Sequence, residues 1–301
     1  MRPVTVRSPA KVNVALLVGK VRADGFHSLA TIYQAVDLHD DVRAKPAPVG
    51  SITVSVSGEE ADRVPTDESN LAVRAARLLA DVTGVDEGVS LTILKRIPVA
   101  GGMAGGSTDA AAALLACDTL WETRLSRDDL MSLAAQLGSD VPFCLVGGTA
   151  VGSGRGEVLS PALVLGEYHW VFAFADRGLS TPDVFAELDR RRRKRKIREP
   201  EIPAQVLAAL RAGNPSLLGE ALVNELQPIT LSLRPELVGI LAVGNECEPL
   251  GAVVSGSGPT VLFLAANTEH AHDIADAVAA SGLVRGVDIA SGPVGGSRVI
   301  G

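Results

Sequence analysis

Aromatic side chains are scarce in this sequence, at 3% of 301 residues, although hydrophobic residues as a whole make up 47%. A core with so few aromatic rings has to be packed mainly from Ala, Val, Leu and Ile. The hydrophobic fraction and the charged fraction of 21% are ordinary for a folded globular protein. The length is sufficient for about two domains.

Long apolar runs and paired cysteines are also missing. The longest uninterrupted apolar run, residues 110–117, is far shorter than the roughly 18 residues of a membrane span. The N-terminal sequence has no apolar block typical of a signal peptide. Cys117, Cys144 and Cys247 form no CxxC pair and no metal-binding spacing. We therefore expect a protein of the reducing cytoplasm that has no membrane partner.

An excess of positive charge is absent as well. The formal net charge is −7, and residues 190–198 contain eight positive side chains, so the rest of the chain carries −15. Such an acidic remainder argues against a general nucleic-acid-binding surface. Two interpretations of the basic run stay open. It is either a solvated helix end or loop, or a local contact for an anion or a nucleic acid.

Apolar spacing and capping residues predict the order of strands and helices. Expected strands cover residues 4–7, 12–18, 29–36, 52–56, 89–97, 170–175, 252–255, 261–265 and 287–290. Expected helices cover residues 69–79, 107–121, 126–138, 182–193, 203–212, 217–226, 235–243 and 268–281. Strands and helices mix without regular β-α-β alternation, which predicts an α+β fold. Glycines and a proline near 155–165 predict two domains, 1–158 and 159–301.

The most distinctive stretch is Arg96-Ile-Pro-Val-Ala-Gly-Gly-Met-Ala-Gly-Gly-Ser-Thr-Asp109, which leads into an alanine-rich segment. A β-branched strand stops at a proline, passes through four glycines and continues as a helix. Glycine lets backbone N–H groups turn toward a ligand. The first turn of a helix adds unpaired N–H donors and a positive dipole end. This arrangement predicts an anion site, most often for phosphate; the alternative is an ordinary strand–helix connection rich in turn residues.

The glycine loop lacks the residues that define the commonest phosphate-binding motifs. The P-loop of NTPases requires a lysine where Ser107 stands. The dinucleotide-binding fingerprint requires a glycine where Met103 stands. The His-Arg-Asp signature of protein kinases is also absent. The loop therefore belongs to a different family of phosphate sites.

Three stretches together carry a family resemblance: Pro9-Ala-Lys-Val-Asn-Val-Ala-Leu16 with Asp24-Gly-Phe-His27, then 98–109, then Ser255-Gly-Ser-Gly-Pro-Thr260. In this order and at these separations they resemble the GHMP small-molecule kinases. Residues 22–27 and Leu137-Gly-Ser-Asp-Val-Pro-Phe143 look like those members that use ATP to phosphorylate the 2-hydroxyl of 4-diphosphocytidyl-2-C-methyl-D-erythritol. That reaction belongs to the non-mevalonate route to isoprenoid precursors. The resemblance covers most of the chain and weakens across 190–250.

The resemblance implies a two-domain GHMP kinase fold. Its N-terminal α+β domain would contain a left-handed βαβ unit, and its C-terminal domain would be ferredoxin-like. ATP and the cytidine-diphosphate-linked polyol would meet in the cleft between the two domains. Nucleic acid is not an expected partner.

The resemblance also assigns catalytic and ATP-binding residues. Asp140 would be the catalytic base, and Lys11 would keep this carboxylate ionised and stabilise charge on the transferring phosphate. Asn70 would lie on the adenosine side. The loop residues implied to surround the ATP phosphates are Val99, Ala100, Gly101, Gly102, Met103, Ala104, Gly105, Gly106, Ser107, Thr108 and Asp109. Among these, the hydroxyls of Ser107 and Thr108 are expected near phosphate or Mg²⁺, and Asp109 either caps the helix or lies near the metal.

Substrate contacts are implied for five further residues. Phe26 and Phe185 would stack on the cytosine ring, and His27 would read its polar edge. Asn13 and Thr181 match positions that hydrogen-bond the erythritol or the diphosphate. For Phe185 the alternative is a core position on an amphipathic helix.

One departure from the family pattern lies in the loop itself. Relatives commonly have glycine where Ala100 and Ala104 stand. A methyl group is tolerated where φ is negative, so we expect the loop to keep its shape.

Two alternative functions remain open on the sequence. One is another GHMP kinase, of the homoserine or mevalonate type, although 24–27 and Phe185 favour a nucleotide-linked substrate. The other is a nucleic-acid-binding module built on residues 190–198, against which stand the acidic remainder and the lack of interleaved aromatic and basic residues.

Overall fold

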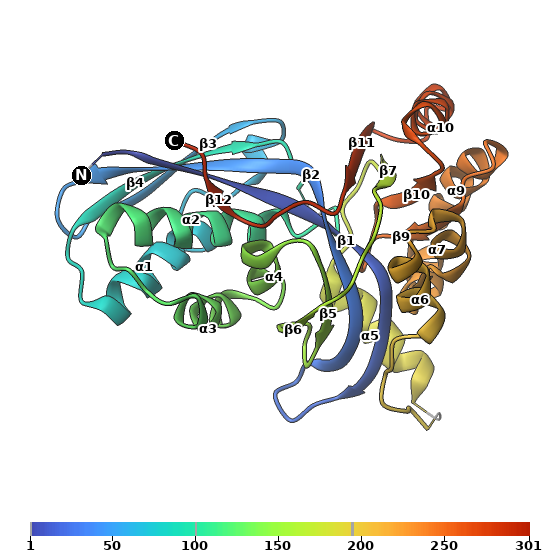
Figure 1. Cartoon of the computed structure of the whole chain (residues 1–301), viewed down its shortest axis with the longest axis horizontal. Helices are drawn as coiled ribbons and strands as arrows, with labels where there is room; N and C mark the ends of the chain where they lie inside the picture. The colour runs from blue at the N-terminus through green and yellow to red at the C-terminus, as the bar shows by residue number, and fades with distance from the viewer. Residues whose placement is uncertain (1, 100, 194–195) are drawn as a thin grey trace.

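The computed structural model describes residues 2–99, 101–193 and 196–301, which form two β-sheets with helices packed on them (Figure 1). The larger sheet is organised around two long antiparallel strands, β1 (Val4–Val21) and β2 (His27–Ala47). Its other strands are β3 (Ile52–Gly58), β4 (Gly88–Lys95), β5 (Thr149–Ser153), β6 (Val158–Pro161), β8 (Val223–Asn224) and β12 (Arg298–Val299). The parallel pair β3 and β4 is connected through α1 (Leu71–Thr83), which makes a βαβ unit.

Helices cover one face of the larger sheet, and α2 (Gly105–Trp121) is the central one (Figure 1). The others on this face are α1, α3 (Arg127–Leu137) and α4 (Val141–Val146), and the short 3₁₀ turn η1 (Ala61–Arg63) follows β3. The alanines of 110–113 are completely buried against β1, β2 and α1. Small side chains let this helix approach the sheet closely, which explains how a core with few aromatic rings is packed.

The smaller sheet is antiparallel, in the order β11-β7-β10-β9. Its strands are β7 (Tyr168–Phe174), β9 (Gly251–Val254), β10 (Val261–Ala265) and β11 (Gly286–Gly292). The helices of this half are α5 (Thr181–Arg192), α6 (Ala204–Ala212), α7 (Pro215–Ala221), α8 (Gln227–Leu233), α9 (Leu237–Glu246) and α10 (Thr268–Ala280). Alternate residues of β7 face opposite sides, so Trp170 and Phe172 pack toward β1 and β2 while Val171 and Ala173 pack toward α9 and α10.

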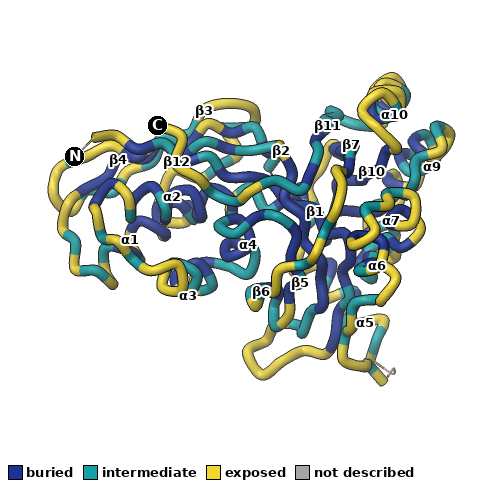
Figure 2. Tube along the Cα trace, in the orientation of Figure 1, coloured by how far each residue is buried: buried dark blue, intermediate teal, exposed yellow. Residues whose placement is uncertain are grey.

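The two halves share strands. β8 pairs in parallel with β1, and β12 pairs with β1 near its start, so both return from the second half to the larger sheet. The predicted domain boundary at 158/159 falls at the beginning of β6 and stays a prediction. Figure 2 shows β1 largely buried, whereas β12, the hairpin of residues 20–26 and the outer side of α10 are exposed.

Two predicted elements were wrong in part. The segments 4–7 and 12–18 are one continuous strand, because Pro9, which has no N–H to donate, lies at a register shift between Pro9 and Ala10 where a bulge tolerates it. The helix predicted over 217–226 ends at Ala221, because the next residues pair with β1 as β8. The short helix α8 was not predicted.

A buried cluster of charges ties the end of β4 to its neighbours. The Lys95 ammonium lies between the carboxylates of Asp40 on β2 and Asp109 on α2, with 2.9 Å between Lys95 Nζ and Asp109 Oδ2. The other oxygen of Asp40 accepts the backbone N–H groups of Arg96 and Ile97 at 2.6 and 2.9 Å. Strand, loop and helix are thereby fixed to one another immediately before the glycine loop.

This buried cluster contains two carboxylates but only one ammonium. The pKa of Asp109 is raised in this environment. Burial, with a further contribution from Asp40, raises the pKa of Asp109 to about 8, although Lys95 opposes the shift. A pKa that is higher in the folded than in the unfolded state gives stability that is lost as pH rises through the folded value.

We therefore predict that Asp109→Asn gains stability relative to the wild type as pH rises from 7 to 9, by about 1 kcal/mol over that interval. The neutral amide has no proton to lose, whereas the wild-type carboxyl does. Urea unfolding at both pH values measures the difference. Asp81→Asn, at an exposed carboxylate on α1, is the control; the same pH trend in both variants would contradict the prediction.

Candidate active site

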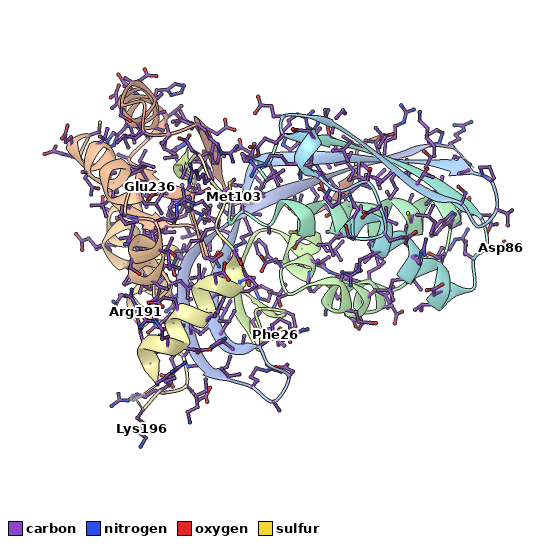
Figure 3. The ribbon with its side chains drawn as sticks, turned by 180° about the vertical axis from the view of Figure 1, so that it is seen from behind. Phe26, Asp86, Met103, Arg191, Lys196 and Glu236 are labelled. Atoms are coloured by element: carbon purple, nitrogen blue, oxygen red, sulfur yellow. The ribbon has the colours of Figure 1, made fainter. Side chains whose placement is uncertain are left out.

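A cleft of about 680 Å³ lies where β1, β2, the glycine loop, α4 and α5 meet. Its lining brings together residues that the sequence separates widely. The predicted site residues in this lining are Lys11, Asn13, Phe26, His27, Gly102, Ala104, Ser107, Asp140, Thr181 and Phe185. In Figure 3, Phe26 lies beside α5 and Met103 lies at the junction of the two halves, where it is buried.

Lys11 and Asp140 face each other at one end of the cleft, with 3.8 Å between Lys11 Nζ and Asp140 Oδ2. The ammonium also donates to Asn13 Oδ1 at 2.6 Å and to the carbonyl of Gly102 at 3.1 Å. Asp140 immediately precedes α4, and its side chain caps no helix N–H. The carboxylate is therefore available to a ligand while a fixed positive charge lies next to it.

Tyr33, which was not predicted, holds the other oxygen of Asp140. Its hydroxyl donates to Asp140 Oδ1 at 3.1 Å, and its ring lies in the cleft lining opposite Asn13 of β1. Tyr33 belongs to a predicted strand and to no motif. Only the pairing register of β1 and β2 shows that it shares the face of Asn13.

The glycine loop lies against the second half of the chain. The Gly102 carbonyl accepts from the hydroxyl of Ser255 at 3.1 Å, and Gly102 has φ of +72°. A Cβ on Gly102 would lie 2.4 Å from the Ser255 carbonyl oxygen. Glycine is required here by both the backbone conformation and the close approach. Residues 255–260 therefore support the loop, and we call this segment the buttress.

Three predictions for the loop need correction. Ala104 has φ of +64°, so the expected negative φ was wrong, and it is the cap that precedes α2. The Thr108 hydroxyl is buried and donates to the Pro9 carbonyl, so it is turned away from any phosphate. Asp109 does not cap the helix; its contact is Lys95, and a metal would have to compete with that ammonium.

Several other loop residues are accounted for. The N–H of Val99 donates to Glu60 Oε2 at 2.7 Å, which leaves it no hydrogen for a phosphate. Ala100 lies outside the described residues. The N–H groups of Gly105, Gly106 and Ser107 form the first turn of α2, where helical N–H groups have no acceptor within the helix. These three donors are therefore available to a phosphate.

Asn70 is the N-cap of α1 rather than a residue just inside it. Its side chain accepts the Ala72 N–H at 2.8 Å and donates to the Pro65 carbonyl at 2.7 Å. A capping role of this kind explains its burial. Its contact with adenosine stays a prediction.

The opposite end of the cleft contains the aromatic residues. The rings of His27 and Phe185 lie 4.8 Å apart, and His27 Nε2 hydrogen-bonds Asp189 Oδ1 at 2.8 Å. The guanidinium of Arg155 lies 4.9 Å from the ring of the exposed Phe26. Asp189 and Arg155 were missed because neither is part of a motif. Phe185 lines the cleft, which favours the substrate interpretation over a core position.

Two further side chains connect α5 to the rest of the site. Thr181, the first residue of α5, shares a hydrogen bond of 2.7 Å with the hydroxyl of Ser257. This contact places the beginning of α5 beside the buttress that supports the glycine loop.

The first residues of the basic run, 190–192, contact other residues of the protein. Arg190 and Arg191 bind Glu187 at 2.6 and 2.7 Å. Arg192 donates to the Val18 carbonyl at 2.6 Å and pairs with Glu225 at 3.0 Å. Residues 194–195 lie outside the described part. These contacts favour the interpretation of the run as a helix end.

Two classes of site are not found in the part of the chain that the structure describes. It contains no cluster of three or more His, Cys, Asp or Glu side chains arranged to bind a metal ion. Within the same residues, no helix is both long and apolar enough to span a membrane.

The positive φ of Ala104 generates a prediction. An L-residue in the left-handed region costs roughly 1–2 kcal/mol, so Ala104→Gly should stabilise the protein by about 1 kcal/mol once the added freedom of the unfolded chain is subtracted. Ala110→Gly, inside the same helix, should be destabilising instead. Chemical denaturation of both variants measures this, and a loss of stability in Ala104→Gly would contradict it.

Comparison with known proteins assigns the chain to a family. The family model described as GHMP kinases N terminal domain matches residues 70–148, and GHMP kinases C terminal matches 206–283. The 4-diphosphocytidyl-2-C-methyl-D-erythritol kinase of Leifsonia xyli subsp. xyli is 52% identical over 100% of this chain and 99% of its own. The protein of the same name from Thermobifida fusca is 54% identical over 99% and 98%.

Solved structures agree. The crystal structure of a 4-(cytidine 5'-diphospho)-2C-methyl-D-erythritol kinase is 32% identical, with a TM-score of 0.78 over 97% of this chain and 100% of that one. A homoserine kinase from Cytophaga hutchinsonii has a TM-score of 0.76 at 19% identity, over 100% and 98% of the two chains, which shows the fold alone. The predicted two-domain α+β fold is confirmed. The chain belongs to the GHMP kinases, which are ATP-dependent small-molecule kinases, and within them to the 4-diphosphocytidyl-2-C-methyl-D-erythritol kinases.

Proposed function

We propose that the cleft transfers the γ-phosphoryl group of ATP to the 2-hydroxyl of 4-diphosphocytidyl-2-C-methyl-D-erythritol. The observation that carries this proposal is the layout of a single cleft. The pair Lys11 and Asp140 lies beside the glycine loop, and the aromatic pair His27 and Phe185 lines the same cleft. A phosphate donor and a nucleotide-linked acceptor can thus be held together.

In the proposed reaction the substrate 2-hydroxyl attacks the γ-phosphorus. The new O–P bond forms as the bond from the γ-phosphorus to the β–γ bridging oxygen breaks, and ADP leaves with that electron pair. The hydroxyl proton passes to Asp140. Phosphoryl transfer has a loose transition state, so the base need not remove the proton early, and positioning dominates. Lys11 stabilises the negative charge on the transferring group.

ATP would lie with its phosphates on the first turn of α2. The N–H groups of Gly105, Gly106 and Ser107 and the positive end of the helix dipole favour an anion there. Mg²⁺ fits this arrangement as an ion bound chiefly by the phosphates, with the Ser107 hydroxyl in the cleft lining as a nearby oxygen. When bound, Mg²⁺ would neutralise charge on the β- and γ-phosphates.

The polyol would be recognised at the centre of the cleft and the cytosine at its outer end. Asn13 is buried, and its amide is oriented by Lys11 and by Thr31, to which Nδ2 donates at 2.8 Å. Phe26 and Phe185 offer rings on which cytosine can stack, a contact worth about 1 kcal/mol beyond area burial.

Cytoplasmic localisation stays a prediction. It is supported by the three cysteines, all of which are free thiols. Free thiols are typical of reducing compartments.

The function is tested by ADP release with purified protein, ATP and Mg²⁺. We expect turnover with 4-diphosphocytidyl-2-C-methyl-D-erythritol and less than about 1% of that kcat/KM with homoserine or mevalonate, because neither offers a ring to the aromatic end. Activity with homoserine or mevalonate and none with the cytidylyl polyol would overturn the proposed substrate.

The catalytic role of Asp140 is tested separately. Asp140→Asn should lower kcat by about 10²- to 10⁴-fold, the usual contribution of a general base, with KM for both substrates changed far less. Asp128→Asn, at an exposed carboxylate on α3, is the control. A kcat near the wild-type value in Asp140→Asn would show that this residue is not the base.

A further inference from the structure

The Tyr33 side chain lies between the cleft and the protein interior. It is 2% exposed, and its ring lies 5.0 Å from that of Phe143 on α4, the helix that Asp140 precedes. Its hydroxyl reaches Asp140 Oδ1 at 3.1 Å. One end of this side chain is therefore fixed by packing and the other end touches the carboxylate.

The hairpin formed by β5 and β6 leaves space for the Tyr33 side chain. Gly156, with φ of +105°, leaves room for the hydroxyl, because a Cβ there would lie 2.2 Å from Tyr33 Oη. A Cβ on Gly152 of β5 would lie 2.8 Å from the Tyr33 ring. The hydroxyl thus occupies a space that the backbone provides for it.

The groups around Asp140 come from several elements. Lys11 of β1 faces Oδ2, Tyr33 of β2 donates to Oδ1, and Cys144 of α4 lies on the buried side. Glu157 and Arg155, from the turn between β5 and β6, lie beyond Tyr33 and pair with each other at 3.5 Å.

Two of these groups remain neutral donors. Burial, reinforced by Asp140, raises the pKa of Tyr33 well above its usual value, so the phenol keeps its proton. Burial raises the pKa of Cys144 to about 12, so the thiol does not compete as an anion. Lys11 is then the charged group in direct contact with Asp140, and Tyr33 is a neutral hydrogen-bond donor to it.

We propose that Tyr33 is a positioning residue that holds Asp140 by Oδ1 and leaves Oδ2, the oxygen beside Lys11, to receive the substrate proton. The inference rests on the proposed role of Asp140. A hydrogen bond to one oxygen stops rotation of the carboxylate, and it stabilises the ionised form of the base. Tyr33 therefore selects the reacting oxygen of the base.

The test uses Tyr33→Phe. Loss of the fixed carboxylate orientation should lower kcat about tenfold, since a displacement of about 1 Å can cost up to 10²-fold. KM for both substrates should change by less than about twofold, because binding groups are untouched. The acid limb of the kcat–pH profile should move up by about half a pH unit, because the ionised base loses a donor.

The chain contains only two tyrosines, which supplies a matched control. Tyr168 is also buried and its hydroxyl also donates a hydrogen bond, of 3.1 Å to the Leu165 carbonyl, but in the second half of the chain. Tyr168→Phe should lose stability without moving kcat or the acid limb. A thermal melt of each variant shows whether it is folded at the assay temperature.

A double-mutant cycle shows whether Tyr33 acts through Asp140. Tyr33→Phe should have no further effect on kcat in the Asp140→Asn protein. If it lowers kcat by the same factor there, or if kcat and the acid limb are unchanged in Tyr33→Phe alone, the proposal is wrong. A normal kcat in Asp140→Asn would instead remove the proposed base itself, so the two failures are distinguishable.

A second measurement covers the case in which Tyr33→Phe does not fold. In the Tyr168→Phe protein, Tyr33 is the one remaining tyrosine, so incorporation of 3-fluorotyrosine alters this residue alone. The more acidic phenol is a stronger donor, so the acid limb should move to lower pH. An acid limb that does not move would overturn the proposal.

Discussion

The carbonyl oxygen of Gly102 is the point on which the site depends. It accepts from Lys11 of β1 and from Ser255 of the second half, so Lys11, the glycine loop and the buttress meet at one atom. A Cβ on residue 102 would lie 2.4 Å from the Ser255 carbonyl oxygen, so this close approach requires glycine. The loop is thus positioned from both halves of the chain, and the lysine that lies beside it belongs to a distant strand and not to the loop's own motif.

Two lysines serve opposite purposes around this loop. Lys95 is buried between two carboxylates and fixes strand, loop and helix. Lys11 is also buried, but its carboxylate partner is farther away and partly exposed to the cleft. Removing water from a charge is tolerated only where partners compensate it. The fully paired lysine therefore holds the structure, while the loosely paired one retains charge that a phosphate can share.

The sequence predicted the site better where residues adjoin in motifs than where they meet through folding. Lys11, Asp140 and the aromatic residues were named from the family resemblance, and the structure brings them into one cleft. Tyr33, Asp189 and Arg155 depend on strand register or helix placement, which local patterns do not encode. The same limit explains why α7 ends at Ala221, earlier than predicted. The apolar spacing over 217–226 is helical, but residues 223–224 pair with β1 instead. The positive φ of Ala104 could not be predicted either, because the residue type alanine does not indicate a positive φ.

The return of β12 to the edge of β1 has a consequence for how the chain folds. Residues 298–299 pair with Val6 and Arg7, so β1 is synthesised long before the strand that pairs with this edge. Until then that segment of β1 presents unpaired N–H and C=O groups, a template for association with other chains. This edge of β1 therefore stays open to association until the long-range pairing with β12, which has a loop-closure cost, has formed.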